Sequence, residues 1–271
     1  EPVLPPDAPA FIHGERTVPW HEASRLSNNL ARALIARGAA PGDKVAVYMR
    51  NRPEYMITLS AAFKARLTHV NVNYRYTPDE VWYIFDNSDA QTVVYASEFR
   101  DAVTQVRDRL PKVKTWVEVS EGGGTAPFAE PFHALADNGD GSALQLERSG
   151  QDLLFIYTGG TTGMPKGVMW PHHDLREVTL SSARKLGPVP ETLEALREHT
   201  RKIGPGGRAL IAPPLMHGTG LLTAIGTHLA GGSLVTLAGE TFDPVEMLDA
   251  IERHKPQSLT IVGDSFARPI L

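Results

Sequence analysis

Residues 157–167 read Tyr-Thr-Gly-Gly-Thr-Thr-Gly-Met-Pro-Lys-Gly, and this stretch decides how the chain is interpreted. One apolar run, residues 153–157, leads into it and a second, residues 168–170, follows it. Such runs favour buried strands, so the sequence predicts a strand, a loop and a second strand. Its glycines allow positive φ and a close approach of the backbone to a ligand. Successive N–H groups in such a turn can converge on an anion, and the threonine hydroxyls with Lys166 suit a polyphosphate.

The motif differs from the P-loop of the common nucleoside triphosphatases. That loop reads Gly-x-x-x-x-Gly-Lys followed by Ser or Thr, and it opens a helix. Here Pro165 precedes Lys166, Gly167 follows it, and an extended segment comes next. A flexible surface linker is disfavoured, because linkers are seldom enclosed by two apolar runs of this kind. We therefore expect the phosphates to lie against a hairpin with no helix N-terminus behind them.

Three stretches together resemble the adenylate-forming superfamily, whose members activate carboxylates with ATP. Tyr157–Gly167 resembles the phosphate loop of that superfamily, and it is the most specific of the three. Val70–Arg75 (Val-Asn-Val-Asn-Tyr-Arg) and Ala212–Gly218 (Ala-Pro-Pro-Leu-Met-His-Gly) agree with it, as does the spacing of about fifty residues between the two loops. In detail the chain is most similar to fatty-acyl and sterol-side-chain CoA ligases, from about residue 10 to the last residue.

The resemblance implies an acid–thiol ligase, an acyl-CoA synthetase that uses ATP, Mg²⁺ and CoA. Its small-molecule partner would be a carboxylic acid, a fatty acid or a sterol side chain. By the same resemblance a threonine hydroxyl of the loop helps to hold Mg²⁺, and Thr158 is the matching position. His217 would border the carboxylate and is the candidate catalytic residue, although a histidine that merely caps the next helix is an alternative. The candidate nucleotide-binding residues are Thr158, Gly159, Gly160, Thr161, Thr162, Gly163 and Lys166.

The chain departs from the family pattern at two places. Gly160 stands where most members have serine, which removes one side-chain donor but keeps the backbone N–H. Arg66-Leu67 replaces a small Gly-Ala-like pair that is common in the family. The acidic residue that would share Mg²⁺ with Thr158 has no counterpart in this chain, since it belongs to a later part of the family's large domain. Gly160 predicts weakened or altered phosphate contacts, and the missing acidic partner argues against metal binding by this chain alone, whereas the resemblance gives no reason for Arg66-Leu67.

Strands and helices alternate along the chain, which favours an α/β fold with mostly parallel sheets. We expect two interleaved lobes, one from residues 44–190 and one that joins residues 10–43 to 205–271. Together they would form an incomplete N-terminal AMP-binding domain over residues 1–271. The predicted helices are 28–38, 53–66, 78–87, 191–202, 221–229 and 245–254. The predicted strands outside the hairpin are 44–49, 68–72, 92–96, 208–212, 233–237 and 258–262.

Several polar segments are predicted to be structural. Residues 121–149 are rich in Gly, Pro, Asp and Ala and read as a long surface connection. Asp137–Gly141 fails as a calcium loop, because oxygen ligands are not spaced at positions 1, 3 and 5. His172 and His173 follow Pro171 at an expected helix start, which favours a capping or surface role. Asp264 and Ser265 follow a strand end and are explained in the same way.

Composition bounds the remaining possibilities. A net charge of −4 provides no basic surface for nucleic acid or for an anionic membrane. The chain has no cysteine, which excludes disulfides and thiolate metal sites. No apolar stretch approaches the ~18 residues that a membrane-spanning helix needs. We expect a cytoplasmic location, and an oligomer remains possible.

The chain is short for the family that it resembles. Family members run to about twice its 271 residues, and both of its ends look cut. We therefore expect the front half of an enzyme, without turnover of its own. A non-catalytic module that binds nucleotide or acyl groups is one alternative, and another adenylating branch, such as an amino-acid-activating domain, is a second.

Overall fold

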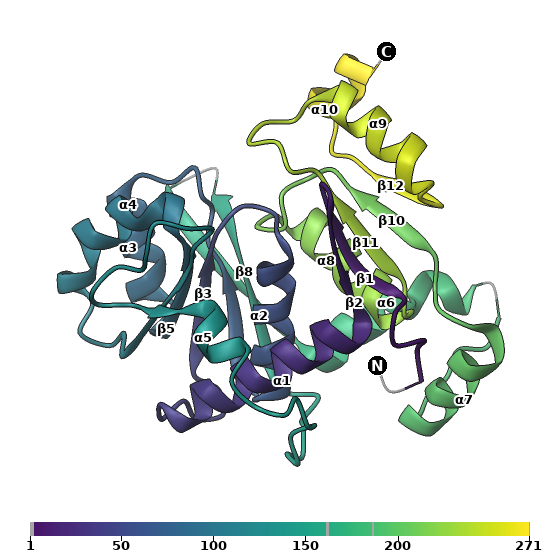
Figure 1. The fold of residues 1–271 in the computed structure, drawn as a ribbon, viewed down its shortest axis with the longest axis horizontal. Helices are drawn as coiled ribbons and strands as arrows, with labels where there is room; N and C mark the ends of the chain where they lie inside the picture. Colours follow the sequence, from purple (N-terminus) through teal and green to yellow (C-terminus); the bar gives the residue numbers. More distant parts are fainter. Residues whose placement is uncertain (1–2, 161–162, 186, 271) are drawn as a thin grey trace. The chain divides into compact units, whose positions relative to one another are not determined.

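The computed structural model describes residues 3–160, 163–185 and 187–270. These residues fall into two compact units (Figure 1). The seven-strand unit comprises Arg25–Arg50 and Glu54–Leu175, and the five-strand unit comprises Glu1–Ser24, Asn51–Pro53 and Arg176–Leu271. Each unit is built around one sheet, so each is described by itself.

The sheet of the seven-strand unit is parallel except at one edge. Its strands lie in the order β7-β6-β5-β3-β4-β8-β9, and only β8 and β9 run antiparallel to each other. The central strands are rich in β-branched and aromatic residues and almost fully buried, as expected where helices cover both faces. The bounds are β3 Lys44–Tyr48, β4 Thr68–Asn71, β5 Ala90–Ala96, β6 Thr115–Val119, β7 Glu130–Pro131, β8 Leu153–Gly160 and β9 Gly163–Pro171.

Helices cover both faces of this sheet. On one face, α3 (Pro78–Asn87) and α4 (Arg100–Val106) bury Val81, Phe85 and Val103 against β3, β4 and β5. On the other face, α2 (Pro53–Lys64) places Tyr55 against His69 of β4. Figure 1 shows α3 and α2 on opposite sides of the strands. The sequence marks α3 sharply, since Pro78 begins it and Thr77 with Glu80 forms a capping box.

The five-strand unit repeats the plan on a smaller scale. Its strands lie in the order β12-β10-β11-β1-β2, parallel except for the β1–β2 hairpin. Helix α8 (Gly218–Leu229) packs on one face and α9 (Pro244–His254) on the other, where Met247 is buried against Leu210 and Val235. The strands are β1 Pro9–His13, β2 Arg16–Pro19, β10 Arg208–Ile211, β11 Ser233–Thr236 and β12 Ser258–Thr260. The other helices are α6 His172–Arg184, α7 Leu193–Ile203 and α10 Asp264–Ile270.

Helix α1 (Trp20–Ala36) begins eight residues before the expected start at Asn28. Ser27, Asn28 and Asn29 are buried beside its apolar residues Leu26 and Leu30. These side chains are buried because they bond to neighbours; the Lys64 ammonium, for example, donates to Ser27 Oγ. The same contacts place Arg25–Ala36 in the seven-strand unit, whereas the expected division joins residues 10–43 to the other lobe.

The expectation of a featureless connection over residues 121–149 is wrong in part. The segment contains β7 and a short helix, α5 (Phe132–Ala136), whose Phe132 and Leu135 are buried. The Gly/Asp loop that follows is bound to α1, since the Gly141 N–H donates to Asn29 Oδ1 and Asn29 Nδ2 donates to Ala136 O. Low apolar content hid these contacts, because the partners of the loop are polar. No helix in the described part of the chain is long and apolar enough to span a membrane.

Candidate functional site

The hairpin of β8 and β9 confirms the predicted strand–loop–strand geometry. Its antiparallel register pairs Leu153 with Pro171 at one end and Gly160 with Gly163 at the other. Thr158 lies directly opposite Lys166, so the two side chains project from the same face of the hairpin. Pro165, which has no N–H to donate, is tolerated because β9 is an edge strand. The arrangement therefore places a hydroxyl and an ammonium group side by side.

The predicted phosphate-binding residues gather at the exposed end of the hairpin. Thr158, Gly159, Gly163 and Lys166 are exposed to solvent. Gly160 is the last residue of β8. Thr161 and Thr162 lie outside the described residues. The second apolar run is less buried than the sequence suggested, since Val168 and Met169 are 44% and 63% exposed on the edge strand.

The glycines of the motif serve two different purposes. A side chain at Gly159 or Gly163 would meet no atom within 4 Å, so the protein's own packing does not require glycine there. Gly163 has φ of 145°, which favours glycine, and its surroundings are open to a ligand. Gly167 is structural instead, because a Cβ there would lie 2.9 Å from Cε2 of the Tyr157 ring. Only part of the glycine pattern is therefore available for ligand binding.

The root of the hairpin is held by residues that sequence reasoning did not select. The backbone N–H of Tyr157 donates to Asn71 Oδ1 at 2.6 Å, and its hydroxyl donates to Asn87 Oδ1 at 2.8 Å. Burial, together with the nearby Tyr83 and Asp89, raises the pKa of Tyr157 to about 12, so the hydroxyl keeps its proton at neutral pH. Asn71 lies in the Val70–Arg75 stretch, but nothing in sequence indicates which strand its amide would reach.

Arg66 acquires a structural role that the sequence left open. It has φ of 62°, a conformation that favours glycine, and its guanidinium donates to both carboxylate oxygens of Asp152 at 2.9–3.2 Å. Burial alone would raise the pKa of Asp152, but the bonds from Arg66 and from the Ser149 N–H outweigh it and lower that pKa. Asp152 directly precedes β8. The larger residue at position 66 therefore braces the start of the hairpin.

His172, which was expected to cap a helix or lie on the surface, is half-buried. It begins α6, but its ring packs on Phe63 with the two ring centroids 4.0 Å apart, and burial lowers its pKa. His173 is exposed. Both histidines follow Pro171, at the end of the hairpin opposite to the predicted phosphate-binding residues.

His217 belongs to the five-strand unit and occupies the N-cap position of α8. Its side chain is exposed and makes no capping hydrogen bond, so the capping alternative for its imidazole is not supported. The loop before it is rigid, because Asn51 Nδ2 donates to Pro213 O and the Leu215 N–H donates to Asn51 Oδ1. Gly220 packs against this loop, where a Cβ would lie 2.5 Å from Pro214 O. A fixed backbone thus presents the imidazole at a helix start.

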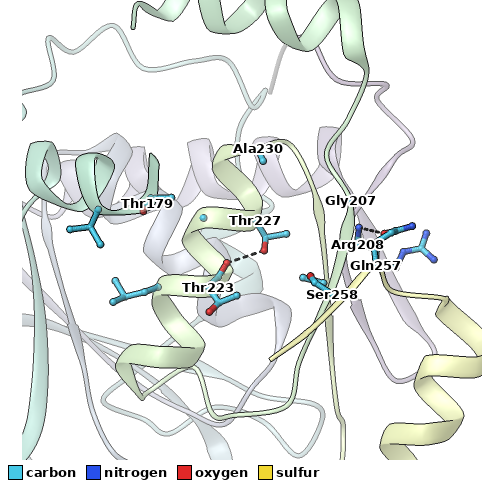
Figure 2. A pocket seen from close by; sticks show the side chains of 12 residues that line it. Thr179, Gly207, Arg208, Thr223, Thr227, Ala230, Gln257 and Ser258 are labelled. Atoms are coloured by element: carbon cyan, nitrogen blue, oxygen red, sulfur yellow. Dashed lines mark hydrogen bonds between the residues drawn. The ribbon is translucent and has the colours of Figure 1, made fainter. Parts of the chain in front are cut away.

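A groove of about 590 Å³ runs along α8 in the same unit. Figure 2 shows Thr223 and Thr227 on successive turns of α8, with Ser258, Gln257 and Arg208 across from them. The hydroxyl groups of Thr223 and Thr227 each donate to a carbonyl four residues earlier in α8. Gln257 Oε1 accepts the backbone N–H of Arg208. The hydroxyls of Thr223 and Thr227 and the Gln257 carbonyl oxygen thus already have partners, so these residues offer mainly methyl and methylene surface to a ligand.

Comparisons with known proteins agree on one family. The family model described as AMP-binding enzyme matches residues 3–268. The medium/long-chain-fatty-acid–CoA/3-oxocholest-4-en-26-oate–CoA ligase of Mycobacterium marinum is 35% identical over 98% of this chain and 49% of its own length. The 3-oxocholest-4-en-26-oate–CoA ligase of Rhodococcus rhodochrous is 35% identical over 99% of this chain and 48% of its own length.

Solved structures give the same result for the fold. A crystal structure described as a long-chain-fatty-acid CoA ligase from Rhodopseudomonas palustris superimposes with a TM-score of 0.81 at 26% identity, over 98% of this chain and 61% of that one. The expected fold class, mostly parallel sheets flanked by helices, is thereby confirmed. The chain spans about half the length of the curated relatives that it matches.

Proposed function

The chain belongs to the AMP-binding enzyme family, and from that premise we propose that it is the part of an acyl-CoA synthetase that binds the phosphates of ATP. The observation that carries the proposal is the pairing of Thr158 with Lys166 at the exposed end of the β8–β9 hairpin. A hydroxyl and a cation on one face, beside two unobstructed glycines, suit the tail of a nucleoside triphosphate.

The proposed reaction has two steps. In the first, a carboxylate oxygen of the acid attacks the α-phosphorus of ATP, the bond to the bridging oxygen of the β-phosphate breaks, and pyrophosphate leaves. In the second, the sulfur of CoA attacks the acyl carbon, the bond to AMP breaks, and the thiol proton is released. Charge on the leaving phosphates must be held throughout the first step, which requires positioned donors more than covalent chemistry.

Each proposed role follows from the chemistry of the side chain. Lys166 supplies a compact, movable cation to the leaving phosphates. Thr158 offers one hydroxyl oxygen, and the N–H groups of Gly159, Gly160 and Gly163 supply backbone donors. We assign Thr161 and Thr162 to the same loop on the sequence alone. His217 would orient the carboxylate of the acid.

The fit of Mg²⁺ is limited. Between residues 3 and 270, omitting 161, 162 and 186, the structure holds no cluster of three acidic or histidine side chains arranged to bind a metal. Mg²⁺ usually keeps several waters and is held by one or two protein ligands plus substrate phosphates. Thr158 could therefore be one ligand of an ion that arrives with ATP. When bound, that ion would neutralise phosphate charge.

The groove along α8 is the candidate site for the acyl tail. Its lining residues on this side run from Leu222 to Ala230, which corresponds to about 12 Å of helix. The methyl and methylene groups that line it suit an apolar chain. The names of the relatives, which specify fatty and oxocholestenoic acids, support this assignment.

The test is direct binding of Mg·ATP to the purified chain, by calorimetry, with and without Lys166→Met. We expect measurable binding that falls at least about tenfold in the variant, because removing one charged hydrogen-bonding group costs about 1.5–3 kcal/mol. An intact chain with no affinity for Mg·ATP would overturn the proposal. We further propose that these 271 residues alone do not catalyse acid-dependent pyrophosphate exchange. Exchange by the isolated chain would contradict that part.

A further inference from the structure

Strand β4 stops pairing with β8 just before the phosphate-binding residues begin. The backbone register joins His69 to Leu154 and Val70 to Phe155, and it goes no further. Beyond that point, within the described part of the chain, β8 pairs only with β9. A two-stranded ribbon has little stability of its own, so its direction must be set where it leaves the sheet.

The side chain of Asn71 takes over where the backbone pairing ends. Its Oδ1 accepts the Tyr157 N–H at 2.6 Å, and its Nδ2 donates to the Tyr157 carbonyl at 3.4 Å. Asn71 is only 1% exposed, so these bonds form in the interior, where an unpaired backbone group is costly. The amide thus continues the ladder of the sheet with a side chain.

Tyr157 is restrained on two further sides. Its hydroxyl is bound to Asn87 at the end of α3, and its ring covers Gly167 on β9. The next residue along β8 is Thr158, and the residue before Gly167 is Lys166, which is the pair assigned to phosphate. Any rotation of Tyr157 therefore moves both groups that the proposed function requires.

From this geometry we propose that Asn71 is a positioning residue for the phosphate hairpin, acting through the backbone of Tyr157. The inference rests on the proposed function, since it concerns the placement of Thr158 and Lys166 against a triphosphate. Asn71 itself touches no substrate. Its loss misplaces the phosphate-binding groups without removing them, and losing one hydrogen bond to a charged group costs roughly tenfold to a hundredfold in affinity.

The chain contains a matched control. Asn29 is also 1% exposed, and its amide likewise accepts one backbone N–H, from Gly141, and donates to backbone carbonyls, those of Ala136 and Gly139. It secures a different loop of the same unit. Asn71→Leu and Asn29→Leu therefore each remove buried bonds between a side-chain amide and the backbone, and both should reduce thermal stability, while only the first frees the hairpin.

Three readouts test the inference on the purified 271-residue chain: Mg·ATP affinity, affinity for inorganic tripolyphosphate with Mg²⁺, and hydrogen exchange of the peptide spanning residues 153–171. For Asn71→Leu we expect both affinities to fall roughly tenfold to a hundredfold and the peptide to exchange faster. For Asn29→Leu we expect none of these changes. Should Asn71→Leu fail to fold, Asn71→Ser keeps a polar group at the site but shortens its reach, and we expect weakened binding there too.

Each contrary result is decisive. Wild-type affinity in a folded Asn71→Leu or Asn71→Ser chain overturns the inference, as does equal weakening by Asn29→Leu, which would indicate general loosening. If wild-type chain binds neither Mg·ATP nor tripolyphosphate, the proposed function fails and takes the functional part of the inference with it. In that case faster exchange of peptide 153–171 in Asn71→Leu would still establish that the Asn71 amide holds the hairpin through the backbone of Tyr157.

Discussion

Thr158 and Lys166 face each other across an antiparallel pair, one residue beyond the point where Tyr157 packs over Gly167. The register decides this relationship, since a shift by one residue would send the two side chains to opposite faces. Because they share a face, they can hold one phosphate group together. Their contributions to nucleotide binding should therefore be coupled.

That coupling gives the first prediction. Thr158→Val and Lys166→Met should each weaken Mg·ATP binding, and the double variant should lose less than the sum of the two. Residues that share a ligand group typically couple by about 0.5–3 kcal/mol. A double-mutant cycle measured by calorimetry checks this. Strictly additive losses would mean that the two side chains act on separate parts of the nucleotide.

The pair formed by Arg66 and Asp152 gives a prediction about stability. Arg66→Gly relieves the left-handed backbone but leaves the carboxylate, which is only 10% exposed, without its guanidinium. Because an uncompensated buried charge costs more than the strain, we expect the melting temperature to fall by a few degrees. Arg66→Gly combined with Asp152→Asn should recover most of the loss. A melting temperature above wild type for Arg66→Gly alone would show that the strain dominates.

Asp152 also predicts a dependence on pH. The folded-state pKa of its carboxyl lies below the usual value, so its stabilising effect is present above the unfolded-state pKa and is lost as pH falls through the folded-state pKa. The difference in stability between wild type and Asp152→Asn should therefore shrink as pH falls below about 4. Urea titrations from pH 6 to pH 3 measure it, and a difference that stays constant would contradict the assignment.

Buried His69 should make the stability of the protein depend on pH in a second range, above the one in which Asp152 acts. Burial lowers its pKa to about 3 in the folded chain, so between that value and the ordinary pKa near 6.5 the unfolded chain binds the extra proton. Stability contributed by this site then falls as pH drops below about 6.5, by up to roughly 1.4 kcal/mol per pH unit. His69→Gln should flatten the slope between pH 7 and pH 5. A slope that stays the same in His69→Gln would contradict this prediction.

The groove along α8 predicts substrate selection. A Cβ at Gly226 would already lie 3.2 Å from Thr179 Cγ2, so Gly226→Leu should fill the groove. In a complete enzyme carrying this chain, we expect KM for long-chain acids to rise about tenfold, as a few lost methylene contacts are worth 1–3 kcal/mol. Short acids that do not reach the groove provide the control. A uniform effect on all acids would place the acyl tail elsewhere.

The sequence by itself determined the local features whose cause is local. Glycine spacing with flanking apolar runs defined the hairpin, and the Pro78 start with its capping residues gave α3 its bounds. The alternation of strands and helices indicated the α/β class. These features follow from backbone freedom, capping and periodicity within about ten residues, and such local patterns can be read from one sequence.

Only the tertiary structure decided which distant residues support the site. The partner of Asn71 is 86 positions away, and so is the partner of Arg66. The loop bound to α1 was hidden for a similar reason, because Asn29 accepts the N–H of Gly141 more than 100 positions later. Hydrogen bonds between distant segments depend on the order and register of the strands. Strand order and register result from the packing of the whole sheet, so no local pattern in the sequence indicates them.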